Sequence, residues 1–321
     1  MRSPTSAVLP PRLGPGTRVA LVAPAGPLLE HDELVRATAL AEALGLTPRL
    51  GAHAARRHGY LAGTDEERAL DLQTALSDPE IDAVWCLRGG YGVTRILDRI
   101  DFAPLRARPK AIVGFSDITA LLLAAGASAG IVTFHGPVAR QPMSAFSRRG
   151  FERVLFRGEP AGPLEALPPP SDVLVPTTNR IVTIRGGTAE GPLAGGNLTL
   201  LHCLVGTPWF PALDGAILFL EDVSEKLYAV DRMLAHLRTI GALSRLAGVA
   251  IGRFTDLDRN AGDGALGFDE VLTTYFGPLG IPVVAGLPIG HIEDQWTLPL
   301  GVRTRLDASR GELAILEPAV R

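Results

Sequence analysis

The sequence predicts an α/β protein with a doubly wound parallel sheet in its N-terminal half and a strand-rich C-terminal part. Short apolar runs of strand length alternate with segments of helical period as far as about residue 150. Three of these runs, DAVWCLRGG, KAIVGFSD and GIVTFHGP, are apolar almost throughout, which is typical of parallel strands covered on both faces. After residue 156 glycine and proline become dense, and alternating strand patterns follow.

The N-terminal elements can be placed in chain order. RVALVAPAG (18–26) is a strand that ends in a turn, and residues 28–44 carry apolar side chains at helical spacing up to Gly45. TDEERALDLQTALSD predicts a helix because it begins with a threonine cap and an acidic first turn. DAVWCLRGG, KAIVGFSD and GIVTFHGP supply three more strands, and residues 118–125 form a helix after the second of them.

The chain of 321 residues is long enough for two domains. We expect an α/β domain over residues 1–156, a linker rich in proline and glycine over 157–178, and a C-terminal domain over 179–321. Within the last domain we expect, in order, strand–turn–strand (IVTIRGGTAEGPLAGG), helix (NLTLLHCLVG), strand (GAILFLED), helix (YAVDRMLAHLRTIGAL) and two strands (LAGVAIGRF, VVAGLPIGH). The ending LPLGVRTRLDASRGELAILEP alternates around a central turn, which predicts an antiparallel hairpin.

Composition narrows the possible functions. The formal net charge of -3 gives no electrostatic reason to expect nucleic acid or an anionic membrane as a partner. The opening MRSPTSAVLPPRLGPG is polar and interrupted by proline, unlike a secretory signal, and no apolar stretch reaches the roughly 18 residues of a membrane span. Cys86 and Cys203 lack the spacing of metal ligands. We therefore expect a soluble cytoplasmic protein without a metal site.

Two neighbouring strands are each followed by a glycine-containing turn, RGGYG after the first and GFSD after the second. Ser116 stands where the second strand turns into a helix, so its hydroxyl projects over the carboxyl edge of the sheet, as suits a nucleophile. The alternative is that Ser116 and Asp117 only cap the helix, since both residue types are common N-caps. The turn RGGYG can cradle a phosphate or donate backbone N–H groups to an oxyanion, but its spacing is not that of a dinucleotide fingerprint.

A serine nucleophile needs a base, and the base needs an acid that orients it. Among seven histidines, His291 follows an apolar strand and a glycine turn, the position where catalytic side chains cluster in α/β folds. His135, at the end of the strand in TFHGP, is the second candidate. For the acid, Glu221 and Asp222 lie at the mouth of the strand in AILFLED. A carboxylate there is either a functional group or the cap of the following helix.

Several motifs together resemble those of one enzyme family. The chain is similar to the serine LD-carboxypeptidases, which include murein tetrapeptide carboxypeptidases and microcin C self-immunity peptidases. The resemblance extends from VALVAPAGP to LPLG, and it is carried by RGGYG, GFSDIT, GGNLTLLHCLVGTPWFP, ILFLEDVSEKLYAVDRML and GLPIGHIEDQWTLPLG.

This resemblance implies a serine peptidase with Ser116 as nucleophile, His291 as base and Glu221 as the acid that orients the base. It also implies a flavodoxin-like N-terminal domain that carries the nucleophile, a smaller β-rich (β/β/α) C-terminal domain, a homodimer, and no metal or cofactor. Together with the turn pattern, it places the oxyanion between the backbone N–H groups of Gly90 and Asp117.

The expected reaction is hydrolysis of an L,D-peptide bond that releases the terminal D-alanine of a muropeptide tetrapeptide during cell-wall recycling. One alternative is a microcin C-type immunity peptidase that cleaves the amide of a peptide–nucleotide conjugate. Another, from a different class, is a non-catalytic α/β ligand-binding protein in which Ser116 caps a helix and Glu221 forms a structural pair.

Candidate contacts to the substrate are less strongly specified. A terminal carboxylate needs a cationic clamp, for which Arg88, Arg68 and Arg185 are candidates that spacing does not separate. Trp209 can stack on a nucleobase or pack in a core, and Asn197 can line the site or cap a helix. We expect the substrate to be contacted by Arg88, Tyr91, Asn197 and Trp209.

Overall fold

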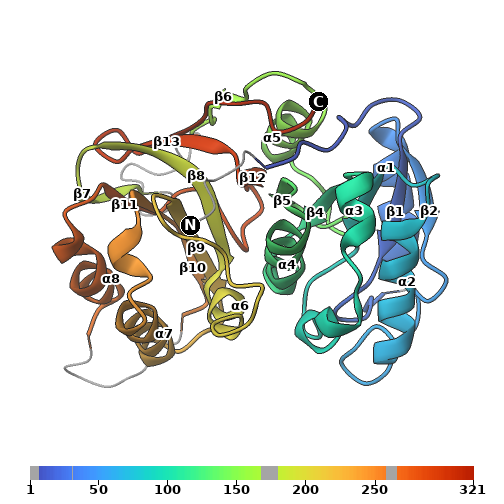
Figure 1. Cartoon of the computed structure of the whole chain (residues 1–321), viewed down its shortest axis with the longest axis horizontal. Helices are drawn as coiled ribbons and strands as arrows, with labels where there is room; N and C mark the ends of the chain where they lie inside the picture. Colours follow the sequence, from blue (N-terminus) through green and yellow to red (C-terminus); the bar gives the residue numbers. More distant parts are fainter. Residues whose placement is uncertain (1–6, 31, 168–179, 258–265) are drawn as a thin grey trace.

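The computed structural model describes residues 7–30, 32–167, 180–257 and 266–321, so residues 168–178 of the expected linker lie outside the described residues. The chain forms two sheets with helices around them (Figure 1). Strands of both sheets contribute to one contiguous cluster of buried apolar side chains. None of the helices in these ranges has both the length and the apolar character that crossing a bilayer requires.

The first sheet has the strand order β12-β5-β4-β3-β1-β2. Strands β1 to β5 are all parallel, and their order 2-1-3-4-5 is that of flavodoxin-like doubly wound folds. This confirms the predicted fold class. The strands are β1 (Arg18–Val22), β2 (Thr47–Leu50), β3 (Ala83–Cys86), β4 (Ala111–Gly114) and β5 (Thr133–His135). The helices of this half are α1 (Glu33–Ala43), α2 (Asp65–Ser77), α3 (Ala103–Ala107), α4 (Thr119–Ala129) and α5 (Ala145–Leu155).

Helix α2 illustrates how local sequence sets an element. The Thr64 hydroxyl accepts a hydrogen bond from the Glu67 N–H, and the Glu67 carboxylate accepts one from the Thr64 N–H. This capping box satisfies two donors that the first turn of a helix leaves free. The start predicted from the threonine and the acidic first turn is therefore confirmed.

The second sheet has eight strands in the order β6-β14-β13-β8-β9-β10-β11-β7, more strands than the first sheet. It is mixed: β8, β9, β10 and β11 are parallel neighbours, and the remaining pairings are antiparallel. The strands are β6 (Gly162–Pro163), β7 (Val182–Arg185), β8 (Thr188–Asn197), β9 (Ile217–Val223), β10 (Gly248–Thr255), β11 (Val283–Ala285), β13 (Arg303–Asp307) and β14 (Glu312–Ile315). The helices here are α6 (Leu198–Cys203), α7 (Leu227–Thr239) and α8 (Phe268–Phe276).

The C-terminal segment only partly follows its prediction. Strands β13 and β14 form the expected antiparallel hairpin. The preceding β12 (Leu298–Leu300) instead joins the first sheet, where it pairs antiparallel with β5 and places Leu298 opposite His135. All three β12 residues are buried, and their pairing covers an edge of β5 that would otherwise be open. The C-terminal chain thus returns to the sheet that carries Ser116.

Helix α4 of the first half makes packing contacts with the second half of the chain. It packs against α6 and β8 of the second half, as seen in the middle of Figure 1. The Thr119 hydroxyl accepts a hydrogen bond from the backbone N–H of Asn197, and Gly196 has no side chain to obstruct the approach, since a Cβ there would lie 2.5 Å from Thr119 Cγ2. This contact brings the end of β8 close to the turn that carries Ser116.

Candidate active site

Ser116 occupies a strained turn at the carboxyl end of β4. The strand ends at Gly114, a short 3₁₀ helix covers Ser116–Ile118, and α4 follows directly. The backbone of Ser116 has a φ of 64°, a left-handed conformation that costs a non-glycine residue of order 1–3 kcal/mol. No side chain caps either helix, so the interpretation of Ser116 as a helix cap is wrong. The turn instead presents the Ser116 hydroxyl above the edge of the sheet.

His291 and Glu221 complete a hydrogen-bonded chain with this hydroxyl. The distance from Ser116 Oγ to His291 Nε2 is 3.0 Å, and the distance from His291 Nδ1 to Glu221 Oε2 is 2.8 Å. Because a carboxylate only accepts hydrogen bonds, Nδ1 carries the proton of a neutral imidazole, and Nε2 accepts from the serine hydroxyl. This is the geometry of a nucleophile, a base and an orienting acid.

Glu221 lies at the end of β9 with its side chain completely buried. The segment between β11 and β12 that carries His291 is the histidine loop. Gly290, the residue before His291, allows the Glu221 carboxylate to approach this loop. A Cβ on Gly290 would lie 2.7 Å from Glu221 Oε2, and the glycine has a φ of 111° that few other residues adopt. The glycine turn noted in the sequence is therefore required for the contact between acid and base.

Helix α5 holds the histidine loop in place. Ser147 Oγ donates a hydrogen bond to the carbonyl of Glu293 at 3.0 Å and accepts one from the Gln295 N–H at 2.9 Å. Ser144 Oγ donates to the carboxylate of Asp294. The sequence reasoning missed these contacts because it did not identify α5, although Ser144 stands at the N-cap of a segment with strong helical amphipathicity.

The second acid candidate, Asp222, has a structural role. Its carboxylate accepts hydrogen bonds from the side-chain amide of Asn197, from the N–H and hydroxyl of Thr199, and from its own neighbour, the N–H of Val223. Burial raises the pKa of Asp222 to about 6. The residue thus secures the start of α6, while Glu221 faces His291.

The second base candidate, His135, is buried behind the hydrogen-bonded chain. Its ring packs edge-on against Phe115 and Phe219 at centroid distances of 5.9 and 5.1 Å. Among the described residues neither ring nitrogen has a hydrogen-bond partner, and burial lowers the pKa of His135 to about 4. Its ring is separated from solvent and makes no hydrogen bond to Ser116, whereas His291 does.

The turn after β3 packs directly on the serine. A Cβ on Gly89 would lie 2.8 Å from Ser116 Cβ and 2.9 Å from Ser116 Oγ. In the described part of the chain, no group accepts a hydrogen bond from the backbone N–H of Gly90 or of Asp117. The Asp117 carboxylate accepts from the N–H of Val93 at 2.9 Å, and its burial raises its pKa to about 6. Sequence reasoning had selected Gly90 but overlooked the tighter approach of Gly89.

A cavity of about 590 Å³ opens beside His291. Its walls come from the end of β4, the loop between β5 and α5, the first turn of α5 and the histidine loop. They comprise Phe115, Pro137, Gln141, Pro142, Met143, Ser144, Ser147, His291, Ile292, Glu293 and Gln295. The cavity is large enough for a short peptide and adjoins the proposed nucleophile through Phe115.

The three arginines considered for a clamp are in different environments. Arg68 is buried, donates to the carbonyls of Pro24 and Gly92, and pairs with Asp65; it links two turns of the fold. Arg185 is exposed on β7, at the edge of the second sheet. Arg88 is half-buried and donates from Nη1 to the Pro27 carbonyl at 2.7 Å. Arg88 directly precedes Gly89, the residue that packs on Ser116, whereas Arg68 contacts the far end of the same turn at Gly92.

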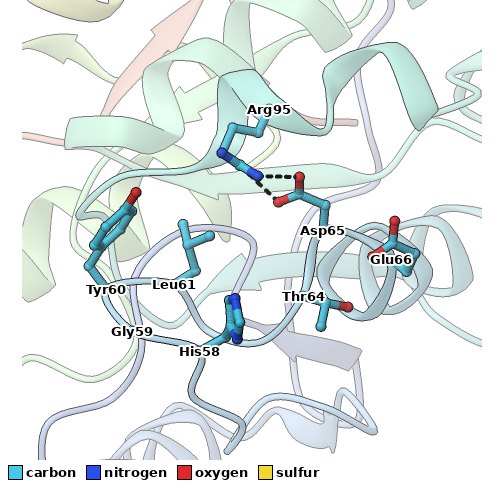
Figure 2. A pocket seen from close by; sticks show the side chains of 8 residues that line it. All are labelled: His58, Gly59, Tyr60, Leu61, Thr64, Asp65, Glu66 and Arg95. Carbon is cyan, nitrogen blue, oxygen red and sulfur yellow. Dashed lines mark hydrogen bonds and ion pairs between the residues drawn. The ribbon is translucent and has the colours of Figure 1, made fainter.

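Tyr91 contacts a residue that lines a second cavity, of about 420 Å³. Its ring packs against Tyr60 at a centroid distance of 5.8 Å, and Tyr60 lines this cavity (Figure 2). Arg95 and Asp65 form a two-pronged ion pair along one wall, at 2.9 and 2.7 Å. Both tyrosines are exposed. The contact of Tyr91 with substrate stays a prediction.

The other two expected substrate contacts are engaged within the protein. Asn197 is buried at the N-cap of α6, where its carbonyl oxygen accepts from the Leu200 N–H and its amide donates to Asp222. Trp209 is half-buried and packs against the apolar core. These contacts match the alternative roles given for the two residues, and contact of either one with substrate stays a prediction.

Comparison with known proteins extends these observations. Residues 19–136 match the LD-carboxypeptidase N-terminal domain, and residues 190–306 match the LD-carboxypeptidase C-terminal domain. The murein tetrapeptide carboxypeptidase of Pseudomonas aeruginosa is 37% identical over 303 residues, which are 91% of this chain and 94% of that protein.

Two solved structures share the arrangement of the whole chain. A muramoyltetrapeptide carboxypeptidase from Oxalobacter formigenes is 33% identical, with a TM-score of 0.79 over 94% of this chain and 99% of the other. The microcin C7 self-immunity protein MccF is 26% identical, with a TM-score of 0.87 over 98% of this chain and 100% of the other. One structure of MccF contains aspartyl sulfamoyl adenosine.

Proposed function

The chain belongs to the LD-carboxypeptidase family, and on this premise we propose that it releases the terminal D-alanine from L,D-linked muropeptide tetrapeptides. The observation that carries the proposal is the hydrogen-bonded chain from Ser116 through His291 to Glu221, at 3.0 and 2.8 Å, beside a cavity of about 590 Å³. Catalysis requires a serine hydroxyl that is held against a histidine and a buried carboxylate, whereas binding of a ligand alone does not require this strained arrangement.

In this mechanism Ser116 Oγ attacks the carbonyl carbon of the scissile bond while His291 Nε2 takes the hydroxyl proton. Glu221 stabilises the imidazolium that forms and keeps its Nδ1–H directed at the carboxylate. The free N–H groups of Gly90 and Asp117 receive the developing oxyanion. His291 then protonates the leaving amine of D-alanine, and a water molecule attacks the acyl-enzyme by the same route.

The test is release of the terminal alanine from a synthetic L,D-tetrapeptide and from its diastereomer with a terminal L-alanine, measured by chromatography of the shortened peptide. Wild-type protein should release one D-alanine per peptide and leave the diastereomer with a terminal L-alanine intact, because inversion at the terminal Cα moves the carbonyl away from Ser116. The Ser116→Ala variant is the matched control and should release none. Equal cleavage of both diastereomers, or none of either, would contradict the proposal.

The immunity-type reaction is the second outcome of the same assay. MccF, whose fold this chain shares, has been solved with aspartyl sulfamoyl adenosine, so an aminoacyl-nucleotide amide belongs among the substrates tested. Preferential cleavage of that amide would assign the chain to this second reaction. The cytoplasmic location, expected from the composition of the sequence, and the homodimer, implied by the family resemblance, stay predictions; sedimentation velocity tests the second.

A further inference from the structure

The arginine pair formed by Arg88 and Arg140 lies beside the turn that packs on Ser116. We propose that these two arginines form the subsite for the terminal carboxylate of the peptide substrate. The inference rests on the proposed function, since an enzyme that removes one residue from a chain end must recognise the carboxylate that marks the end. Arg140 was not among the residues selected from the sequence.

Backbone contacts bring the two arginines together. Arg88 follows β3, and Arg140 lies in the loop after β5. The N–H of Arg140 donates to the carbonyl of Leu87 at 3.2 Å, and the N–H of Ala139 donates to the carbonyl of Cys86 at 3.0 Å. The two side chains therefore leave the backbone at neighbouring points. In the first sheet β4 lies between β3 and β5, so both loops flank the strand that leads into the turn of Ser116.

The pair carries more positive charge than its surroundings neutralise. Arg140 Nη1 forms an ion pair with the buried carboxylate of Glu33 at 2.7 Å. Within the described ranges, no carboxylate lies within ion-pair distance of Arg88, which donates to the Pro27 carbonyl instead. Burial and the adjacent charge of Arg140 lower the pKa of Arg88, and Glu33 opposes them. Of these two guanidinium groups only Arg140 has a carboxylate as its partner, and a second carboxylate would balance the charge of the pair.

Both guanidiniums also have hydrogen-bond donors to spare. The Nε atoms of Arg88 and Arg140 are buried, and among the described residues neither has a partner. A buried N–H of a charged group without a partner is unfavourable. A carboxylate is the natural ligand for such donors, because its oxygens accept several charge-assisted hydrogen bonds and match the planar guanidinium.

The position of the pair fits the leaving side of the scissile bond. Gly89 packs on Ser116, and Arg88 directly precedes Gly89 in the chain. Arg88 Nε and Gly90 Cα both lie close to Gly26, because a Cβ on Gly26 would be 3.4 Å from the first atom and 3.5 Å from the second. On the other side, Arg140 directly precedes Gln141, which lines the 590 Å³ cavity. The peptide would occupy that cavity, and its terminal carboxylate would reach the arginines past the turn of Gly89 and Gly90.

The experiment compares two substrates and two substitutions at each of the two arginines. The substrates are the L,D-tetrapeptide with a free terminal carboxylate and the same peptide with a terminal carboxamide. Wild-type kcat/KM should favour the carboxylate by at least about tenfold, as expected for charge-assisted hydrogen bonds. Arg88→Gln and Arg140→Gln should each lower kcat/KM for the carboxylate by about ten- to a hundredfold and leave the value for the carboxamide within about threefold. Arg88→Lys and Arg140→Lys should retain part of the preference, because lysine keeps the positive charge but lacks the planar guanidinium with its several N–H donors.

Arg245→Gln is the matched control, because Arg245 forms an exposed ion pair with Asp214 at 3.3 Å in the second half of the chain; its preference for the carboxylate should equal that of wild type. A wild-type enzyme without this preference, or Gln variants that lose both activities equally, would overturn the subsite. If the Gln variants do not fold, the wild-type preference and the Lys variants decide.

The subsite and the reaction can fail separately. Binding of both peptides to Ser116→Ala protein, measured by calorimetry, tests the subsite without turnover: the carboxylate form should bind at least about tenfold more tightly, and Arg140→Gln should abolish the difference. Preferential binding of the carboxylate without release of D-alanine by wild type would contradict the proposed function and support the subsite. Release of D-alanine with no preference for the carboxylate would support the proposed function and contradict the subsite.

Discussion

At the level of single residues, the site depends on groups held under conformational constraint. Ser116 keeps a left-handed backbone, with a φ of 64°, although it caps no helix. A conformation of this kind persists only where surrounding contacts impose it. Here the constraint points the hydroxyl at His291, whose other nitrogen is fixed by the buried Glu221. Position, rather than an unusual residue type, suits this serine for the proposed role of nucleophile.

The first prediction concerns the cooperation of Ser116 and His291. Ser116→Ala and His291→Ala should each lower kcat by a factor of about ten thousand or more, and the double variant should be little worse than either single one, because the two groups act in one proton transfer. Steady-state release of D-alanine measures the effect. Losses that multiply in the double variant would show that the two residues act independently.

Glu221→Gln is the second prediction. The amide keeps the size of the carboxylate but not the charge that stabilises the imidazolium, so kcat should fall by about a thousandfold or more while the fold persists. Asp222→Asn is the control for a neighbouring buried carboxylate. Because Asp222 bonds to Asn197, Thr199 and Val223 rather than to His291, its kcat should stay within about tenfold of wild type. A reversed order of the two effects would make Asp222 the orienting acid.

At the level of elements, the site is assembled where several strand ends and loops converge. The turns after β3 and β4 meet at Gly89 and Ser116, β9 supplies Glu221, and the loop after β11 supplies His291. Helix α5 fixes that loop through Ser147. Neighbouring parallel strands bring their carboxyl ends to one edge of a sheet, which is why two consecutive βα turns can face the same substrate atom.

The third prediction tests this convergence of turns. In Gly89→Ala the new Cβ would lie 2.8 Å from Ser116 Cβ and 3.3 Å from the Asp117 nitrogen, so the proposed nucleophile and a proposed oxyanion donor must both move. We expect kcat to fall by about a hundredfold or more, with a loss of about 1–3 kcal/mol in the free energy of unfolding. Kinetics and urea unfolding measure the two effects.

Gly14→Ala is the matched control, because nothing lies within 4 Å of a Cβ at that position and its φ is not in the left-handed region. It should leave both kcat and unfolding unchanged within error. Wild-type kinetics in Gly89→Ala would show that the turn after β3 has room to spare and that Gly89 does not position Ser116.

At the level of the whole molecule, the two sheets form one structure around the site. Strand β12 returns from the second half to pair with β5, α4 packs against α6 and β8, and buried titratable groups lie along this junction. His135 sits on β5 opposite Leu298, with a pKa lowered to about 4 by burial. Asp117 belongs to the first half of the chain and Asp222 to the second half, and burial raises the pKa of each to about 6. Stability should therefore depend on pH through this junction.

The fourth prediction follows from the direction of these pKa shifts. His135 binds a proton less readily in the folded than in the unfolded protein, so it contributes stability above pH 6.5 that is lost as the pH falls towards 4. Asp117 and Asp222 have raised pKa values and act in the opposite direction, so their contribution to stability is lost as the pH rises through 6. His135→Phe removes the first contribution. Between pH 7 and pH 4.5 the variant should lose about 2 kcal/mol less unfolding free energy than wild type.

Urea unfolding at the two pH values measures the difference, and His58→Phe, at an exposed position, is the control that should follow wild type. Identical pH dependence in His135→Phe and wild type would show that His135 is not held neutral by its surroundings.

The sequence by itself determined the features that depend on near neighbours in the chain. Hydrophobic period and caps predicted most strands and helices of the first half, including the threonine cap of α2, but not β2, α3 or α5. The chemistry of short motifs, together with family resemblance, singled out Ser116, Glu221 and His291. These features are readable because a residue's secondary structure and its place at a strand end depend mainly on a few flanking residues.

Only the tertiary structure decided which of these groups meet. His291 is separated by 175 residues from Ser116 and by 70 from Glu221, and no local pattern specifies a distance between such positions. The same holds for β12, whose apolar LPL fits a hairpin as well as the edge of the first sheet, and for Arg140, which lies 52 positions after Arg88 in the sequence but beside it at the sheet edge. Burial and hydrogen bonding between distant segments select one arrangement from many that are locally equivalent, and that selection exists only in the folded chain.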